Sequence, residues 1–425
     1  MRPTPELKES RQRWWLMVLL IAGMLFAYAQ RGALSVAAPF MMKDLGLSAA
    51  AMGVLLSAFF WCYAFMQVPA GWMVDRMGVR RAYAWGFAIW SVASALTGFA
   101  RGMLELIAAR VVLGVGQSSS FPASARAVSN WFQDRERGSV TAAYLTGVRL
   151  GQALISAVGA VFVAAYSYKL FFLTIGLVPM VWLIPWSRFL RKWELVRPRP
   201  AGSERRTAGA SRFSLLANLC LFRQVSVLGI FLGFFAYDYA WYVYVTWLPS
   251  YLMMERKFTA AEMGLYSSIP YLAMSATILL SGFLSDALVR RGHAEIRVRK
   301  LLIVIGLLIA CLIVPAGLVE DKMSAVWLLT MSIAGLGIAA PNTWTLTQAV
   351  CARNIVGTVS GIQNFGGNLG GILAPMLTGS IASATRSFAL ALGLTGGILV
   401  VGILSYCFLV HRHVELQPAV QQRAA

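Results

Sequence analysis

Three arginines stand inside long apolar stretches of the sequence, at Arg31, Arg110 and Arg149. An arginine at the centre of a bilayer costs roughly 2.5–3.5 kcal/mol unless it is paired or hydrated, so such a residue usually serves a function. Tyr28 lies one helical turn before Arg31 and Gln117 lies two turns after Arg110, so each pair shares a helix face. A guanidinium binds a carboxylate through two parallel hydrogen bonds. The pattern therefore predicts a binding site for a small organic anion.

The elements that carry these arginines are long apolar segments. Of the 425 residues, 58% are hydrophobic and 13% are charged, and the mean hydropathy is +0.67, which is too apolar for one soluble core. Runs long enough to cross a hydrocarbon layer of about 30 Å recur along the chain. They predict spans at 14–38, 50–73, 81–99, 103–124, 139–163, 168–190, 225–251, 263–286, 300–318, 325–348, 356–381 and 386–410. Continuous runs favour helices over barrel strands, which predicts an all-α membrane protein of about twelve transmembrane helices.

The net charge of +20 reflects membrane topology rather than binding to nucleic acid. Most lysines and arginines fall in alternate loops and the tails, which places both termini in the cytoplasm of a multi-pass protein of the inner (plasma) membrane. The densest basic cluster lies in 191–222, among prolines, glycine and serine. We expect this segment to be a cytoplasmic linker that can contact anionic lipid headgroups.

The polar inventory argues against an enzyme. The five cysteines are scattered, the three histidines fall in predicted cytoplasmic segments, and no nucleophile, metal set or acid/base pair gathers on one side. We therefore expect no metal and no cofactor, and we expect a monomer whose partners are a small organic anion and the lipid bilayer. A transport-like sensor is the alternative, but the tail after Arg412 is short for a signalling domain.

A short signature occurs twice, six predicted helices apart. Gly71 precedes Asp75 by four residues at the end of the second span, and Gly282 precedes Asp286 in the same way at the end of the eighth. This repeat indicates two six-helix halves, 1–190 and 223–425, joined by the linker 191–222. An aspartate at a helix end can contact the positive end of a partner helix in one conformation and lose that contact in another. We therefore predict a conformational latch at Gly71, Asp75, Arg76, Gly78, Arg80 and Asp286; the alternative is that the arginines only follow the positive-inside bias.

Longer motifs identify a family. Residues 71–81 (GWMVDRMGVRR) resemble the loop signature of the major facilitator superfamily. Residues 28–39 (YAQRGALSVAAP), 110–122 (RVVLGVGQSSSFP) and 246–249 (TWLP) resemble its anion:cation symporter family, which includes bacterial sugar-acid and hexuronate transporters and sialin-like proteins. The resemblance implies two pseudo-symmetric six-helix bundles and secondary active uptake of a sugar acid or related carboxylate by alternating access.

The resemblance also implies residue roles. It assigns substrate contact to Tyr28, Arg31, Tyr63, Arg110 and Asn364. Structural alternatives stay open: backbone pairing for the two arginines, packing for the tyrosines, and a bridge between helices for Asn364. Arg149 is a further candidate, whose alternative is a position between helices.

Two departures from the family pattern bear on coupling. Many proton-coupled members have acids at the positions of Gln30 and Gln117, and an amide carries no proton. Asp238, within the predicted seventh helix, stands where family members commonly have Asn. It is a relocated proton carrier, an ionised partner for an arginine, or a structural residue. The coupling ion, H⁺ or Na⁺, therefore stays open, as do uniport or anion exchange. A drug or metabolite exporter is disfavoured because the fifth span lacks the Gly-Pro pair typical of drug/proton antiporters.

Overall fold

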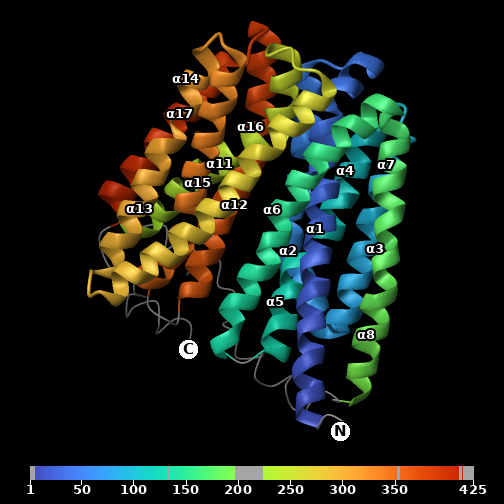
Figure 1. Ribbon diagram of the computed structural model, residues 1–425, viewed down its shortest axis with the longest axis vertical. Helices are drawn as coiled ribbons and strands as arrows, with labels where there is room; N and C mark the ends of the chain where they lie inside the picture. Colours follow the sequence, from blue (N-terminus) through green and yellow to red (C-terminus); the bar gives the residue numbers. More distant parts are fainter. Residues whose placement is uncertain (1–4, 133, 197–223, 352–354, 411–413, 415–425) are drawn as a thin grey trace. The chain divides into compact units, whose positions relative to one another are not determined.

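The computed structural model describes residues 5–132, 134–196, 224–351, 355–410 and 414 (Figure 1). Over this part of the chain the backbone is helical almost throughout, and the only extended pairing in it is an isolated bridge between Cys351 and Val414. The prediction of an all-α protein is confirmed. The predicted linker 191–222 and the basic residues that follow Val196 lie mostly outside the described residues.

The first part of the chain forms α1 (Pro5–Leu45), α2 (Ala49–Met77), α3 (Val79–Thr97), α4 (Met103–Gln117), α5 (Ser120–Trp131), α6 (Asp134–Ala165), α7 (Tyr168–Leu177), the 3-10 helix η1 (Val178–Trp182) and α8 (Leu183–Val196). Local chemistry sets several of these limits. The Ser48 side chain accepts a hydrogen bond from the Ala51 amide and caps α2. Gly78 has a φ of 85° between α2 and α3, a conformation that favours glycine.

The second part forms α11 (Val225–Ser250), the π-helix η2 (Tyr251–Glu255), α12 (Ala260–Arg290), α13 (Glu295–Ala310), α14 (Ile313–Leu318), α15 (Lys322–Val350), α16 (Val356–Thr385), α17 (Ala389–Leu404) and the π-helix η3 (Ser405–Leu409). Every predicted span lies on one helix or on two consecutive ones, except 168–190, which lies on α7, η1 and α8 (Figure 1). Nine segments among the described residues are long and apolar enough to cross a membrane. The other predicted spans lie on α3, on α4 with α5, and on α16, which are rich in glycine, serine or arginine.

Backbone contacts group the chain into two compact units. The first contains 1–195, 245–272 and 375–386, and the second contains 196–244, 273–374 and 387–425. The first unit thus includes the end of α11 and parts of α12 and α16: the Ser35 hydroxyl donates to the Thr246 carbonyl over 2.7 Å, and the Trp247 indole donates to the Pro375 carbonyl over 3.0 Å. The predicted domain limits at 190 and 223 stay a prediction.

Glycines permit close helix crossings inside each unit. In the first, α1 and α6 pack along their length (Figure 1), with Gly147 facing the carbonyl of Ile21 and Gly151 facing that of Leu25. In the second, α13 and α15 cross at Gly306 and Gly335, each of which faces the other's carbonyl oxygen. Gly366, Gly367 and Gly370 of α16 likewise pack against α11.

Alanine at Gly147 or Gly151 tests the α1–α6 crossing. A Cβ at either position would collide with a backbone oxygen that cannot move aside, so we expect each change to destabilise the protein by about 1–3 kcal/mol. Gly393→Ala in α17 is the matched control, because no atom lies within 4 Å of its Cβ position and alanine favours helix. The thermal unfolding midpoint in detergent measures the effect. Equal midpoints for Gly151→Ala and Gly393→Ala would contradict the close crossing.

Candidate functional site

Arg31 lies at the centre of a buried cluster built from α1, α2 and α4. Its side chain is almost fully buried, with 4% of the residue exposed. The Arg31 Nε and Nη2 atoms both donate to Gln117 Oε1, each over 3.1 Å. The guanidinium carbon lies 4.3 Å, 4.4 Å and 4.7 Å from the ring centres of Tyr28, Phe59 and Tyr63. Because three aromatic faces and one amide surround the cation, it is held in place without burial in bare hydrocarbon.

Gln117 is positioned by the way in which α4 ends. Its Nε2 donates to the Ala27 carbonyl over 2.8 Å while its oxygen accepts from Arg31, so the amide joins α4 to α1. The three serines that follow, Ser118, Ser119 and Ser120, each donate back to the carbonyl three residues earlier. Such local bonds compete with the helical ladder. They interrupt the helix at Gln117, and α5 continues from Ser120.

Arg110 supplies a second cation to the same cluster. It is 3% exposed, and its guanidinium carbon lies 5.6 Å from the centre of the Phe59 ring, which Arg31 also contacts. Gly114 lies against the Phe59 carbonyl and lets α4 approach α2 closely enough for this contact. The Arg110 Nε is buried and has no hydrogen-bond partner among the described residues. Two buried guanidinium groups therefore share one aromatic ring, and one of them has an unmet donor.

The structure places the other two predicted residues of the first unit away from the shared ring. Gln30 turns towards α3 and α7, where its Nε2 donates to the Ile175 carbonyl over 2.7 Å and to the Ser91 hydroxyl over 3.3 Å. Arg149 lies on α6 beside Tyr271 of α12, as does Gln152. Gly32 leaves space on α1 for the Gln152 amide. The predicted roles of Gln30 in coupling and of Arg149 in substrate binding stay predictions.

Asn364 and Asp238 belong to the second unit. Asn364 lies on α16, and its backbone carbonyl accepts from the Asn368 side chain over 2.9 Å. Asp238 is half-buried on α11, where its carboxylate contacts α16 at Gly367, a position at which any side chain would collide with it. Tyr406 of η3 is fully buried within electrostatic range of this carboxylate. The close approach of α11 to α16 beside Asp238 thus depends on a glycine.

The residues of the predicted latch surround the end of α2. Asp75 Oδ1 lies 3.6 Å from Arg126 Nε of α5, with both side chains about half exposed. The Arg76 guanidinium lies 4.8 Å from the Trp72 ring, and the Arg80 carbonyl accepts from the Trp186 indole over 3.1 Å. No atom lies within 4 Å of the Cβ position of Gly71, so close packing does not require that glycine here. Asp75 has a partner helix, and switching of that contact stays a prediction.

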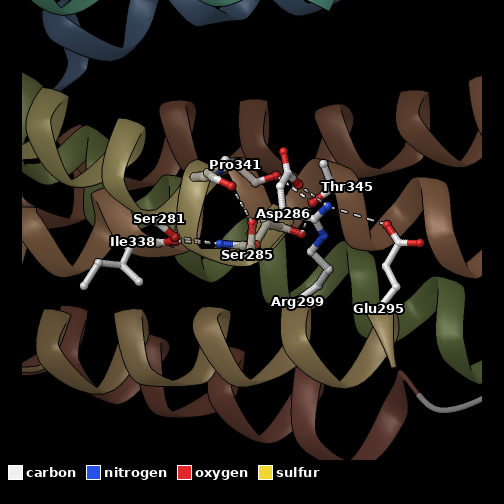
Figure 2. Close-up of polar contacts among 10 residues, drawn as sticks. Ser281, Ser285, Asp286, Glu295, Arg299, Ile338, Pro341 and Thr345 are labelled. Carbon is white, nitrogen blue, oxygen red and sulfur yellow. Dashed lines mark hydrogen bonds and ion pairs between the residues drawn. The ribbon is translucent and has the colours of Figure 1, made fainter. Parts of the chain in front are cut away.

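The repeated aspartate, Asp286, takes part in a denser network (Figure 2). Arg299 of α13 donates to Asp286 Oδ1 over 2.8 Å, donates to the Ser285 hydroxyl, and lies 3.6 Å from Glu295 Oε1. Nearby, the Ser281 hydroxyl donates to the Ile338 carbonyl over 2.7 Å. The Arg299 side chain is 8% exposed, whereas its acidic partners are 55% and 47% exposed. The buried guanidinium therefore needs these partners in place of water, whereas both acids can be solvated without it.

This asymmetry predicts unequal effects of mutation. Asp286→Asn with Glu295→Gln leaves a buried guanidinium without a counter-charge. We expect the free energy of unfolding to fall by about 2–3 kcal/mol, which is less than for a fully buried ion pair because both acids are half exposed. Arg299→Met removes the cation and releases two acids that water can reach, so about 1 kcal/mol or less should be lost. Thermal midpoints in detergent compare the two variants. A larger loss for Arg299→Met would contradict this assignment.

Three residues of these clusters escaped the sequence analysis. Phe59 lies one turn before Tyr63 on the same face of α2, and that spacing was available as a signal. Arg299 follows Glu295 by four residues at the start of a predicted span, which marks an ion pair rather than a topogenic charge. Arg126 carries no comparable signal, because its partner Asp75 lies on another helix.

Comparison with known proteins defines the class to which this arrangement belongs. Residues 20–375 match the model of the Major Facilitator Superfamily. In structure, the chain is similar to a bacterial homolog of the human lysosomal transporter Spinster, in an inward-facing and occupied conformation, with a TM-score of 0.73, 17% identity and 97% of each chain covered. That likeness shows the fold. The chain belongs to the major facilitator superfamily, and it is a membrane transporter rather than an enzyme.

Curated relatives extend the comparison over nearly the whole chain. A D-galactonate transporter of Escherichia coli is 32% identical over 96% of this chain and 98% of its own. A hexuronate transporter of Bacillus subtilis is 31% identical over 92% of each chain. A probable sulfoacetate transporter of Cupriavidus necator is 32% identical over 90% of each chain. These relatives confirm the predicted resemblance to sugar-acid transporters of the superfamily.

Proposed function

We propose that this protein is a secondary active transporter that takes up small organic anions across the inner (plasma) membrane, with a sugar acid or related carboxylate as substrate. The observation that carries the proposal is the pair of buried guanidinium groups, Arg31 and Arg110, on the ring of Phe59. Gln117 holds Arg31 with a neutral oxygen where a carboxylate would cancel its charge. Two cations with an unmet donor favour an anionic ligand strongly.

Relatives support the substrate class. The galactonate, hexuronate and sulfoacetate transporters named above each carry an organic anion with a carboxylate. A carboxylate fits the fork of Arg31 or Arg110, while Tyr28, Tyr63 and Asn364 have the hydroxyl and amide groups that bind sugar hydroxyls. We assign substrate contact to these five residues. Transport proceeds by alternating access between two halves, with both termini in the cytoplasm and the protein acting as a monomer.

Uptake into proteoliposomes tests the proposal. Radiolabelled galactonate, a hexuronate, sulfoacetate and a dicarboxylate are offered one at a time, with neutral galactose as the control for charge. A pH gradient, a sodium gradient and a membrane potential are imposed separately. Accumulation of at least one anion and not of galactose is expected. Uptake of galactose alone, or of no anion under any gradient or by exchange, would overturn the substrate class.

We propose that coupling runs through Asp238 and uses a proton. Its carboxylate is half-buried against Gly367, and Tyr406 of η3 lies within electrostatic range of it. Protonation would remove a charge from the interior of the second unit, which is the kind of change that biases a two-state transporter. Gln30 and Gln117 cannot carry the proton. The alternatives, sodium symport and passive exchange, are distinguished by the same gradients.

Asp238→Asn separates coupling from transport. We expect this variant to lose accumulation driven by the pH gradient and to keep exchange of labelled for unlabelled anion, because the neutral amide fills the same space. Asp44→Asn is the matched control, since Asp44 accepts a hydrogen bond from the Tyr168 hydroxyl at the start of α7. Unaltered pH-driven accumulation in Asp238→Asn would refute the assignment. Loss of exchange as well would make Asp238 a structural or binding residue instead.

A further inference from the structure

An apolar groove of about 710 Å³ lies along the surface of the first unit, between α3 and α4. The two helices run side by side (Figure 1). Its walls include Trp85, Ile89, Val92 and Leu96, which recur every three to four residues and form one stripe of α3. Each of these four side chains is between 40% and 60% exposed. The small residue Ala108 of α4 makes the surface concave rather than flat.

A basic pocket of about 270 Å³ lies next to this groove at the start of α3. It is formed by Arg80, Arg81, Ala84 and Trp85. Trp85 lines both cavities, so the basic pocket and the apolar groove lie on either side of one indole. The first turn of α3 contains no acidic residue. At the other end of the groove stands Glu105, which carries the opposite charge.

The dimensions suit one class of molecule. From Arg81 to Leu96 the helix rises by about 22 Å, whereas one leaflet contributes about 15 Å of hydrocarbon. A lipid whose phosphate contacts the arginines would therefore keep its acyl chain within the groove down to the middle of the bilayer. Tryptophan is typical of the boundary between headgroups and hydrocarbon, and Trp85 lies at that boundary between pocket and groove. The acid at the far end would repel an anionic headgroup from the other leaflet.

We propose that this groove is a binding site for an anionic phospholipid, with its phosphate at Arg80 and Arg81 and one acyl chain along α3 and α4. Charge complementarity favours a lipid over a second copy of the chain, which would need to present an acidic patch. Arginines next to a membrane surface attract anionic headgroups, and each contributes roughly a fivefold gain in affinity. The two together select phosphatidylglycerol over phosphatidylcholine by about thirtyfold.

Native mass spectrometry of the purified full-length protein tests this site. Phosphatidylglycerol and phosphatidylcholine with identical acyl chains are titrated in detergent, and retained lipid is counted. We expect Arg80→Gln with Arg81→Gln to lower retention of phosphatidylglycerol about thirtyfold, to the level of phosphatidylcholine. Arg290→Gln with Arg291→Gln is the matched control: it removes two exposed arginines at the end of α12, neither of which lines the groove or the basic pocket. Equal losses in the two double variants would mean a diffuse effect of charge and overturn the proposal.

The acyl-chain part of the site is tested separately. Ala108→Phe fills the groove and should reduce retention of both lipids, whereas Ala276→Phe should not. Ala276 is the control because it is exposed on α12 beside the exposed side chains of Leu272, Leu279 and Phe283. Inorganic phosphate in excess should leave phosphatidylglycerol bound; displacement by phosphate would reduce the site to an anion pocket and contradict the role of the groove. A dimer that Ala108→Phe abolishes would show that a second copy is the occupant instead.

Discussion

Arg31→Ala should weaken substrate binding severely while the protein stays folded, and this is the largest effect that the structure leads us to expect. Truncating one partner of a buried, hydrogen-bonded charge pair costs 2–5 kcal/mol or more, a loss of roughly thirtyfold to several thousandfold in affinity. Folding should survive, because the contacts of Arg31 are to aromatic faces and to Gln117, which can bind a water in its place. Calorimetric titration with the anion identified in the uptake panel measures the loss.

Two further variants define the role of Arg31. Arg31→Lys keeps the charge but loses the planar fork and its stacking on three rings, so an intermediate affinity is expected. Arg256→Gln removes another buried arginine, one bonded to the Tyr251 hydroxyl, and should leave affinity nearly unchanged. Full binding by folded Arg31→Ala would move the anion site elsewhere. A loss in Arg256→Gln equal to that in Arg31→Ala would mean that net charge, rather than this cluster, determines affinity.

Gln117→Glu should produce the second largest effect, because it places a carboxylate where Arg31 now meets a neutral amide oxygen at 3.1 Å. A unit negative charge about 7 Å from the substrate carboxylate opposes binding by about 2 kcal/mol at an effective dielectric constant of about 20, or about thirtyfold in affinity. The introduced acid also gives Arg31 an internal partner that competes with the substrate. Binding should therefore weaken at neutral pH and recover in part when acid protonates the new side chain.

The affinity of Gln117→Glu at several pH values provides the measurement. Gln363→Glu is the matched control, because Gln363 is also fully buried but accepts from the Thr347 hydroxyl in the second unit. Gain of pH-driven accumulation by Gln117→Glu with Asp238→Asn would show that this site can carry a proton. An affinity for the anion that does not change in Gln117→Glu would contradict the view that a net positive cluster selects the substrate.

Part of the arginine cluster could be predicted from the sequence. Spacing placed Tyr28 with Arg31 and placed Arg110 with Gln117, and these residues do lie in one cluster. Spacing could not show that Gln30, next to Arg31 in the chain, turns towards α3 and α7. Helical periodicity shows which residues of one helix share a face. Which neighbouring helix a side chain on that face contacts depends on the packing of the helices around it.

Phe59 and Arg299 are residues whose contacts with other helices could not be predicted from the sequence. Spacing places Phe59 on the same helix face as Tyr63, but only the approach of α4 to α2 at Gly114 brings Arg110 to the ring that Arg31 contacts. Arg299 stands just before the predicted span 300–318. Its burial with Asp286 arises because α13 follows α12 after a short turn.

The sequence by itself determined the all-helical membrane class, the positions of the spans, the repeated aspartate and the choice of arginines, because hydrophobic length and buried charge are properties of composition and order. Tertiary structure decided which arginines share a ring, which glutamine holds the cation, and where the surface between α3 and α4 is hollowed. These features depend on contacts between helices that are far apart in the chain. Packing, rather than periodicity, brought two of the three predicted arginines together in one buried aromatic cluster.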